Sequence, residues 1–194
     1  MEPMNLPTVC PAQNCRTAFS VEHSDICTAG ATTIHRHNHI RDIIASYAEK
    51  AFGSSSTSLE PTLGRIEENS GHLVAGNNKD QARADICIRG LTNPQIDAFL
   101  DVAVISPSCQ SNVNYSVSCS VKARERIKRN SYQDRIKKQL AGDFHPVVFS
   151  SGGMIGETAR SIINTIASKL SSKTDEDNRK ASMEIKSEIS FSLI

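Results

Sequence analysis

Two aspartates lie in segments whose residue pattern predicts β-strands. Asp101 lies within the apolar run 99–105, which predicts a central strand buried on both faces. Asp85 lies in 84–89, where the alternation puts the two isoleucines on one face and Asp85 on the other. A buried carboxylate is costly unless an Arg or Lys, several backbone N–H groups or a bound cation compensates its charge.

These two carboxylates could share a divalent cation. Mg²⁺ takes oxygen ligands from one or two carboxylates, completed by waters and phosphates, and Glu60, which precedes a proline, is a candidate for a third oxygen ligand. The alternative is structural: Asp85 ends a strand at the surface and Asp101 pairs with Arg83 or Arg89. Spacing alone does not separate these interpretations.

The segment 120–141 predicts a helix with Ala123, Ile127, Ile136 and Leu140 facing inward. Its other residues are strongly basic, with eight cations against Glu125 and Asp134: Lys122, Arg124, Arg126, Lys128, Arg129, Arg135, Lys137 and Lys138. Such a face is a candidate phosphate-binding surface, and Lys128 could point inward at the carboxylates. An ordinary solvated helix is the alternative.

A second chemical constellation lies near the N-terminus. Cys10, Cys15, His23 and Cys27 offer four zinc ligands, and structural zinc holds small loop-rich segments that cannot fold alone. Three downstream histidines are competing ligands: His35, His37 and His39. Reduced thiols in a loop are the other interpretation.

Composition restricts the classes of protein. The net charge of +1 over 194 residues excludes a uniformly basic nucleic-acid binder, so a nucleic-acid surface must be a local patch. No apolar run reaches the roughly 20 residues of a membrane span. Residues 1–5 lack the basic and apolar regions of a signal peptide. We therefore expect an intracellular protein, nuclear or cytoplasmic, without membrane contact.

The remaining pattern predicts an α/β domain. A helix is expected over 38–52, with Asn38 as its N-cap and Gly53 as its stop, followed by a flexible insertion at 53–80. A third strand is expected at 144–149, and helical spacing resumes after the Gly152-Gly153 turn. The segment 181–194 predicts a C-terminal helix that is cut short.

A series of short motifs follows in order along the chain. These motifs are Asn5-Leu6-Pro7-Thr8-x-Cys10, Phe19-Ser20-Val21-Glu22-His23-Ser24-x-x-Cys27-x-x-Gly30, Arg36-His37-Asn38-x-x-Arg41-Asp42, Glu60-Pro61, Arg83-Ala84-Asp85-Ile86, Phe99-Leu100-Asp101-Val102-x-Val104, Lys128 with Tyr132, Phe144-x-Pro146-Val147-Val148-Phe149-Ser150, Gly152-Gly153-Met154-x-Gly156 and Ile189-Ser190-Phe191. In this order they resemble the region C-terminal to the reverse transcriptase in animal non-long-terminal-repeat retroelements.

The resemblance implies a CCHC zinc motif at 8–30 followed by a restriction-endonuclease-like domain of the PD-(D/E)xK type at 35–170, a mixed sheet flanked by helices. It implies zinc on the four Cys and His ligands and Mg²⁺ or Mn²⁺ on Asp85 and Asp101. Ala103 stands where the simple motif has its lysine, so Lys128 is implied as a displaced catalytic lysine. Ala84 replaces the motif's proline.

The function so implied is nicking of target DNA by metal-dependent phosphodiester hydrolysis, with DNA as partner and the RNA of the parent element as a second. The residues expected to contact nucleic acid are Arg36, His37, Asn38, Arg124, Arg126, Arg129 and Tyr132. Two alternatives are a non-catalytic nucleic-acid-binding module and an inactive retroelement remnant. The sequence does not give the DNA target or the oligomeric state.

Overall fold

The computed structural model describes residues 7–63, 65–66, 73–74, 82–175 and 177–193. The first two residues of the motif that begins at Asn5, most of 64–81 and Ile194 lie outside the described residues. Among the described residues, no helix has the length and apolar character needed to cross a membrane.

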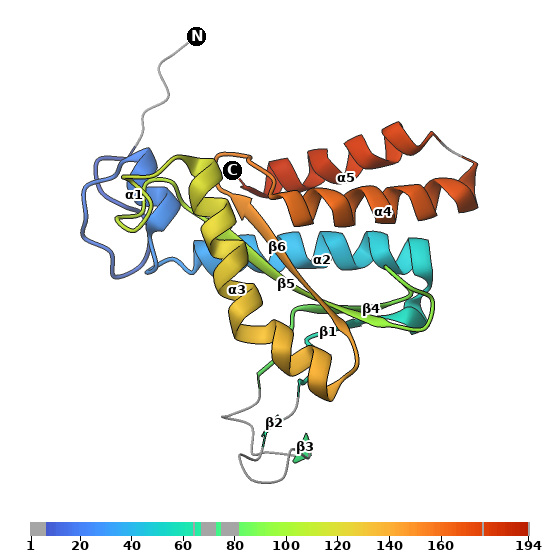
Figure 1. Cartoon of the computed structure of the whole chain (residues 1–194). Helices are drawn as coiled ribbons and strands as arrows, with labels where there is room; N and C mark the ends of the chain where they lie inside the picture. The colour runs from blue at the N-terminus through green and yellow to red at the C-terminus, as the bar shows by residue number, and fades with distance from the viewer. Residues whose placement is uncertain (1–6, 64, 67–72, 75–81, 176, 194) are drawn as a thin grey trace.

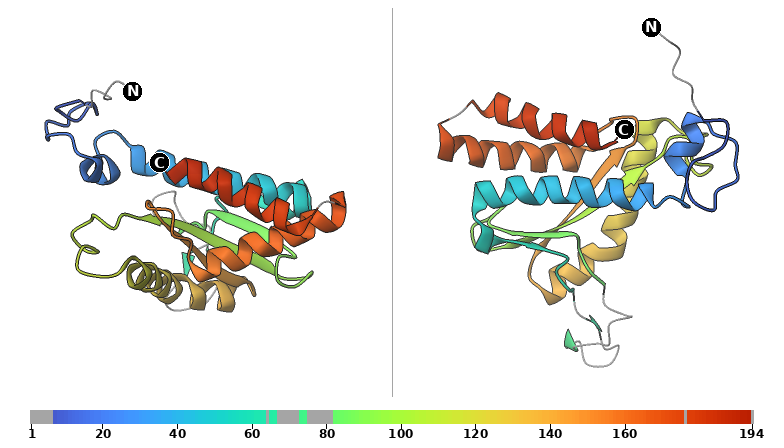
Figure 2. Two further views of the ribbon diagram at one scale, coloured as in Figure 1. Left: turned by 90° about the horizontal axis from the view of Figure 1, so that it is seen from above. Right: turned by 180° about the vertical axis from the view of Figure 1, so that it is seen from behind.

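The chain forms three layers, with one sheet between two layers of helix (Figures 1 and 2). A four-stranded mixed sheet has the order β1-β4-β5-β6. The strands are β1 (Thr57–Leu59), β4 (Ile86–Arg89), β5 (Asp97–Ile105) and β6 (Asp143–Ser150). The strand β4 is antiparallel to both of its neighbours, β1 and β5, whereas β5 and β6 are parallel. A separate two-residue ladder joins β2 (Arg65–Ile66) to β3 (Leu73–Val74).

Helices cover both faces of the sheet (Figure 2). One face carries α2 (Thr32–Phe52), α4 (Glu157–Thr174) and α5 (Asn178–Leu193), and the other carries α3 (Val117–Gln139). A short helix, α1 (Val21–Ile26), lies beyond one end of the sheet beside the β5–α3 connection, and a 3-10 turn at Ser54–Ser56 precedes β1. The observed class is therefore α/β with a mixed sheet flanked by helices, as the sequence predicts.

The main core is aliphatic and lies between the sheet and the three helices. Ile44 of α2, Ile86 of β4, Leu100 of β5 and Ile163 of α4 are 0–1% exposed within it. Burying side chains of this size contributes roughly 1.5–3 kcal/mol each. This cluster holds β5, which carries Asp101, and β4, which begins at Ile86 rather than at the predicted residue 84, so that Asp85 directly precedes it. Both carboxylates are therefore positioned by the packed sheet.

The helix α4 begins without a cap of its own, and α3 supplies one. Gly156 at the N-cap position has no side chain, and the Thr158 N–H donates to Glu125 Oε1 at 3.3 Å. Glu125 is buried, and a Cβ on Gly156 would lie 2.6 Å from this oxygen. A carboxylate suits a helix N-terminus because the orphan N–H groups and the helix dipole favour negative charge there.

Several local predictions were wrong. The first long helix begins at Thr32 rather than 38, with Ala31 at its N-cap position and Asn38 inside the helix. Gly53 does end it, at φ 100°. Residues 57–59, within the expected flexible insertion, form β1 because they complete the edge of the sheet beside β4. Ile127 is 53% exposed rather than inward, because Val121, Glu125 and Ile136 face the sheet on α3 instead.

Candidate metal centres

A tight hairpin and the helix α1 build the N-terminal cluster. The Cys10 N–H donates to Thr17 O at 3.0 Å and the Cys15 N–H to Ala12 O at 3.0 Å, so the chain reverses between the two cysteines. Asn14 takes the left-handed conformation in this turn, at φ 68°, which asparagine tolerates better than most residues.

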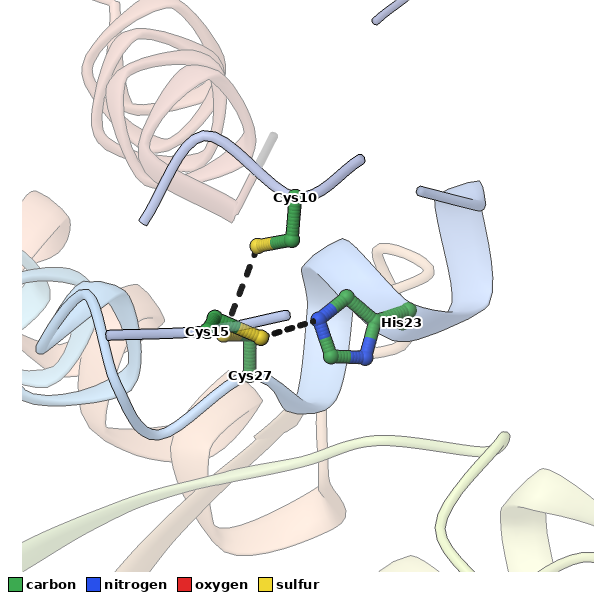
Figure 3. A group of neighbouring side chains, drawn as sticks. All are labelled: Cys10, Cys15, His23 and Cys27. Atoms are coloured by element: carbon green, nitrogen blue, oxygen red, sulfur yellow. Dashed lines mark hydrogen bonds between the residues drawn. The ribbon is translucent and has the colours of Figure 1, made fainter. Parts of the chain in front are cut away.

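Capping of α1 orients the histidine of the cluster. Ser20 at the N-cap accepts a hydrogen bond from the His23 N–H at 3.0 Å. The imidazole then lies with its Nε2 3.2 Å from Cys15 Sγ, and Cys10 Sγ lies 3.7 Å from Cys27 Sγ (Figure 3). Local turn chemistry therefore brings together ligands that are spread over 18 residues of sequence.

The four ligand atoms fit a zinc ion. All of them lie within 4.8 Å of one another. At Zn–S bonds of about 2.3 Å, two sulfurs of a tetrahedral site lie about 3.8 Å apart, close to the Cys10–Cys27 separation. His35 and His39 are exposed on α2 and do not join the group. The cluster Cys10, Cys15, His23 and Cys27 could thus hold zinc.

The protonation of the thiols is already biased within this cluster. Hydrogen bonds from Thr17, with contributions from Cys10 and His23, lower the pKa of the Cys15 thiol to about 6. A backbone hydrogen bond from Ala12 lowers the pKa of Cys10, but desolvation and the neighbouring thiols together raise it above its usual value. Thiolates are the form that binds zinc.

The second candidate centre lies at one end of the β4–β5 ladder. The ladder begins with Ile86 paired to Leu100, so Asp85 and Asp101 are the next residues along the two strands. Asp85 Oδ2 accepts the Val102 N–H at 2.6 Å, and Asp85 Oδ1 lies 3.2 Å from His37 Nε2. These contacts fix the Asp85 carboxylate beside β5.

Asp101 is contacted from α3, which covers the face of the sheet opposite to α2. It is 6% exposed, and Lys128 Nζ of α3 lies 2.8 Å from its Oδ2. Burial raises the pKa of Asp101, with Lys128 opposing the rise and Asp85 adding to it. The Lys128 ammonium also lies 5.7 Å from the centre of the Tyr132 ring, which packs against Phe144 at 5.5 Å. Lys128 therefore does point inward, and Asp101 pairs with it rather than with an arginine.

The carboxylates have the chemistry of a hard-cation site. Two oxygen donors at one ladder end suit Mg²⁺ or Mn²⁺. Each carboxylate oxygen accepts more than one interaction, so the contacts to His37, Val102 and Lys128 leave further acceptor positions on Asp85 and Asp101. A cation there would offset the burial that disfavours the charged form of Asp101.

Glu60 does not supply the expected third ligand. Its carboxylate binds Arg41 at 2.8 Å and Arg83 at 3.2 Å. Within the described residues it does not gather with Asp85 and Asp101 into a group of three metal-ligating side chains. The Glu60 N–H does donate to Asp85 O at 2.9 Å, so the residue braces the backbone of this centre.

The expected nucleic-acid contacts divide into engaged and exposed side chains. Arg36 binds Asp25 at 2.8 Å and Arg129 donates to Thr158 Oγ1 at 2.7 Å. His37 contacts Asp85, Tyr132 packs under Lys128, and Asn38 is half-buried in α2. Arg124 and Arg126 are exposed, as are three further cations of α3: Lys122, Lys137 and Lys138.

Sequence reasoning missed two residues that organise these centres. Arg41 lies one turn after His37 on α2, so the i,i+4 spacing was a signal that both share one helix face. That face meets two acids, with Arg41 on Glu60 and His37 on Asp85. Asp25 gave no such signal. It joins α1 to the sheet by accepting from Arg36, Ser106 and Ser151, and these partners are distant in sequence.

No protein-family model matches this chain, and no curated protein sequence matches it. The two centres are therefore interpreted from their own geometry.

Proposed function

We propose that this chain is a metal-dependent DNA endonuclease domain of the restriction-endonuclease-like type, preceded by a zinc-binding segment and related to the C-terminal region of non-long-terminal-repeat retroelement proteins. The mixed sheet with helices on both faces is consistent with that fold. The order of the short motifs supports the retroelement relationship.

One observation carries the proposal: two carboxylates and a lysine from three separate elements meet at one end of the β4–β5 ladder. Asp101 is buried, and Lys128 lies 2.8 Å from it. A buried carboxylate in a strand centre weakens a fold unless its charge is used or compensated. Perturbed acids paired with a cation are enriched at functional sites.

The chain's own residues take distinct roles in this proposal. Asp85 and Asp101 hold the cation, and His37 together with the Val102 N–H orients Asp85. A bound Mg²⁺ or Mn²⁺ supplies a nucleophilic water at neutral pH and stabilises charge on the phosphate oxygens. Lys128 opposes the rise that burial causes in the pKa of Asp101, and it neutralises negative charge that develops on the scissile phosphate.

Exposed cations of α3 hold the DNA backbone. Arg124, Arg126 and Lys122 lie within two turns N-terminal of Lys128 on the same helix. Contacts of this kind give binding that weakens steeply with salt. The partner in this proposal is DNA, and RNA of the parent element is a second nucleic acid that the same cations would attract.

The test is nicking of supercoiled plasmid by zinc-loaded protein, with and without added Mg²⁺ or Mn²⁺. EDTA is avoided because it would also strip zinc. We expect cleavage that needs the divalent cation and falls at least about a hundredfold in Asp101→Asn, since even outer-shell changes cost 10–100-fold. Asp97→Asn on the same strand, where Asp97 pairs with Arg89 at 2.8 Å, is the matched control and keeps activity.

A non-catalytic nucleic-acid-binding module is the second candidate. The observation that favours it is that each carboxylate already has a partner, since Lys128 contacts Asp101 and His37 contacts Asp85. Salt-dependent DNA binding by the unmodified protein, with no cleavage at any divalent-cation concentration, would select this function and reject the endonuclease.

A further inference from the structure

A cavity of about 900 Å³ lies outside both metal centres. Its walls come from α1, the N-terminal part of α2, the end of β5, the connection that follows β5 and the first half of α3. Figure 1 shows that connection running beside α1, beyond the end of the sheet. Crevices at the carboxyl ends of strands are the usual ligand sites of α/β sheets.

The wall of this cavity exposes large apolar side chains. Ile26 is 40% exposed, Tyr115 is 68% exposed and Ile127 is 53% exposed, and all three line the cavity. They come from three different segments, α1, the β5–α3 connection and α3. Convergence of exposed apolar side chains and a tyrosine on one hollow is typical of a binding site for a partly apolar ligand.

The charged groups of the wall are mainly cationic. Asp25 is neutralised by Arg36 at 2.8 Å. Arg124 and Arg126 also line the cavity, and neither has an acidic partner within the described part of the chain. The cavity thus combines surfaces on which a base can stack with arginines that can contact phosphate, the pairing used by single-strand binding proteins.

The zinc segment forms part of this wall. Asp25 and Ile26 lie in α1 between the ligands His23 and Cys27, so the ion that orders the segment would also order one side of the cavity. The end of β5 forms another part of the cavity wall, and the same strand carries Asp101. Ile105, in the cavity wall, lies four positions after Asp101, a distance of about 13 Å along the strand.

We propose that this cavity receives an unpaired base of the DNA strand whose backbone lies along α3. The proposal rests on the proposed endonuclease function and specifies its substrate as DNA with an unpaired nucleotide near the nicking site. A separation of about 13 Å equals about four nucleotide steps at 3.4 Å each. Tyr115 supplies the stacking surface, and Arg124 and Arg126 hold the flanking phosphates.

The test compares binding of two 20-bp DNA duplexes of the same sequence, one fully paired and one carrying a single unpaired 2-aminopurine. Zinc-loaded protein is used without added Mg²⁺, and anisotropy gives the Kd. We expect tighter binding to the unpaired duplex and quenching of the 2-aminopurine. Tyr115→Ala should reduce this preference about 5- to 150-fold, the range that base–aromatic stacking supplies, and Tyr115→Phe should keep it.

The matched control is Phe191→Ala, because Phe191 is an aromatic residue of α5 that is 79% exposed and lies outside the cavity wall. It should bind both duplexes as the unmodified protein does. Equal affinity for the two duplexes, or an undiminished preference in Tyr115→Ala, overturns the proposal. Tighter binding of an RNA stem with the same unpaired base overturns the assignment to DNA.

The two proposals fail separately in these experiments. Plasmid nicking without any preference for the unpaired duplex rejects the base-binding cavity and leaves the endonuclease intact. A preference that depends on Tyr115 in a protein that never nicks DNA rejects the endonuclease and leaves a site for an unpaired base.

Discussion

The two candidate centres are stabilised in opposite ways. None of the six described residues of α1 is buried, and Val9, Val21 and Ile26 of the N-terminal segment are 40–68% exposed. The residues that are buried in 8–30 are Cys10 and Cys27, two of the candidate zinc ligands. The carboxylate pair lies instead on strands packed against a large aliphatic core.

This contrast separates two sources of order. A segment without an apolar core needs ligation to fold, because little burial opposes its conformational entropy. The carboxylates need no ion to be placed, since hydrogen bonds and core packing already fix their strands. We therefore expect metal removal to unfold one region and leave the other folded.

The largest effect should follow loss of zinc from 8–30. Cys27→Ser removes one of four ligands, and structural zinc supplies about 10–16 kcal/mol of binding free energy in comparable peptides. Metal analysis should find about one zinc per unmodified chain and little in the variant. Hydrogen exchange should reach unfolded rates in 8–30 while α2 and the sheet stay protected. Cys119→Ser, an exposed thiol on α3, should retain its zinc, and equal zinc in both variants contradicts the ligand assignment.

The next effect concerns the core. Ile163→Ala opens a cavity at a position that is 0% exposed in α4, so the free energy of unfolding should fall by about 2–5 kcal/mol. Urea unfolding measures this, with zinc content unchanged. Ile127→Ala, at a position 53% exposed, should stay within about 0.5 kcal/mol. A cost below about 1 kcal/mol for Ile163→Ala would show that the sheet region does not depend on this packing.

A smaller loss of stability is expected where Asp25 connects α1 to the sheet domain. Asp25→Ala removes the acceptor of Arg36 and Ser151, at 2.8 Å and 2.7 Å, and of Ser106. A buried donor left unsatisfied costs about 1–3 kcal/mol, and these donors are partly buried, so the cost should lie toward the lower end of that range. Faster hydrogen exchange in α1 with unchanged zinc content is the expected result. Asp134→Ala, an exposed acid on α3, is the control. Unchanged exchange in α1 would mean that zinc alone docks the segment.

The smallest effect on the free energy of unfolding should follow loss of the hydrogen bond between Tyr47 and Glu188 at the edge of the apolar core. Tyr47 of α2 donates to Glu188 Oε1 of α5 at 2.7 Å, and Tyr47→Phe should cost about 0.5–1.5 kcal/mol at pH 7. Burial first, and then Glu188, raises the pKa of Tyr47. The folded state therefore holds this proton more tightly, so its contribution is complete below about pH 10 and is lost as the pH rises further. Urea unfolding should show a shallower alkaline loss in Tyr47→Phe, and identical slopes would contradict this role.

The local features were the ones that the sequence predicted well. Alternation at 84–89 and the apolar run at 99–105 correctly placed Asp85 away from the isoleucines and Asp101 in a buried strand. Gly53 correctly ended a helix. The Cys and His spacing gave the four members of the N-terminal cluster, since all four ligands lie in one short segment. Each of these signals acts within a few residues of chain.

Predictions failed where a distant partner decided the outcome. Glu60 was expected beside the carboxylates, but Arg41 and Arg83 hold its side chain. The contact of His37 with Asp85, 48 residues away, was not predicted, and its expected contact with DNA stays a prediction. Glu125 was expected on the outward, basic face of its helix, but its buried carboxylate caps the N-terminus of α4. In each case the competing interaction comes from another element.

Residue types and spacing by themselves determined the α/β class, the aliphatic core, the four-member Cys and His cluster, and the place of Asp101 in a buried strand with Asp85 next to its neighbour. The tertiary structure alone decided which cation meets each carboxylate and that Asp25 joins α1 to the sheet. It also decided that a cavity opens between the zinc segment and α3. Periodicity reports which side of its own element a residue occupies, whereas ion pairs and cavities depend on the order and register in which separate elements pack.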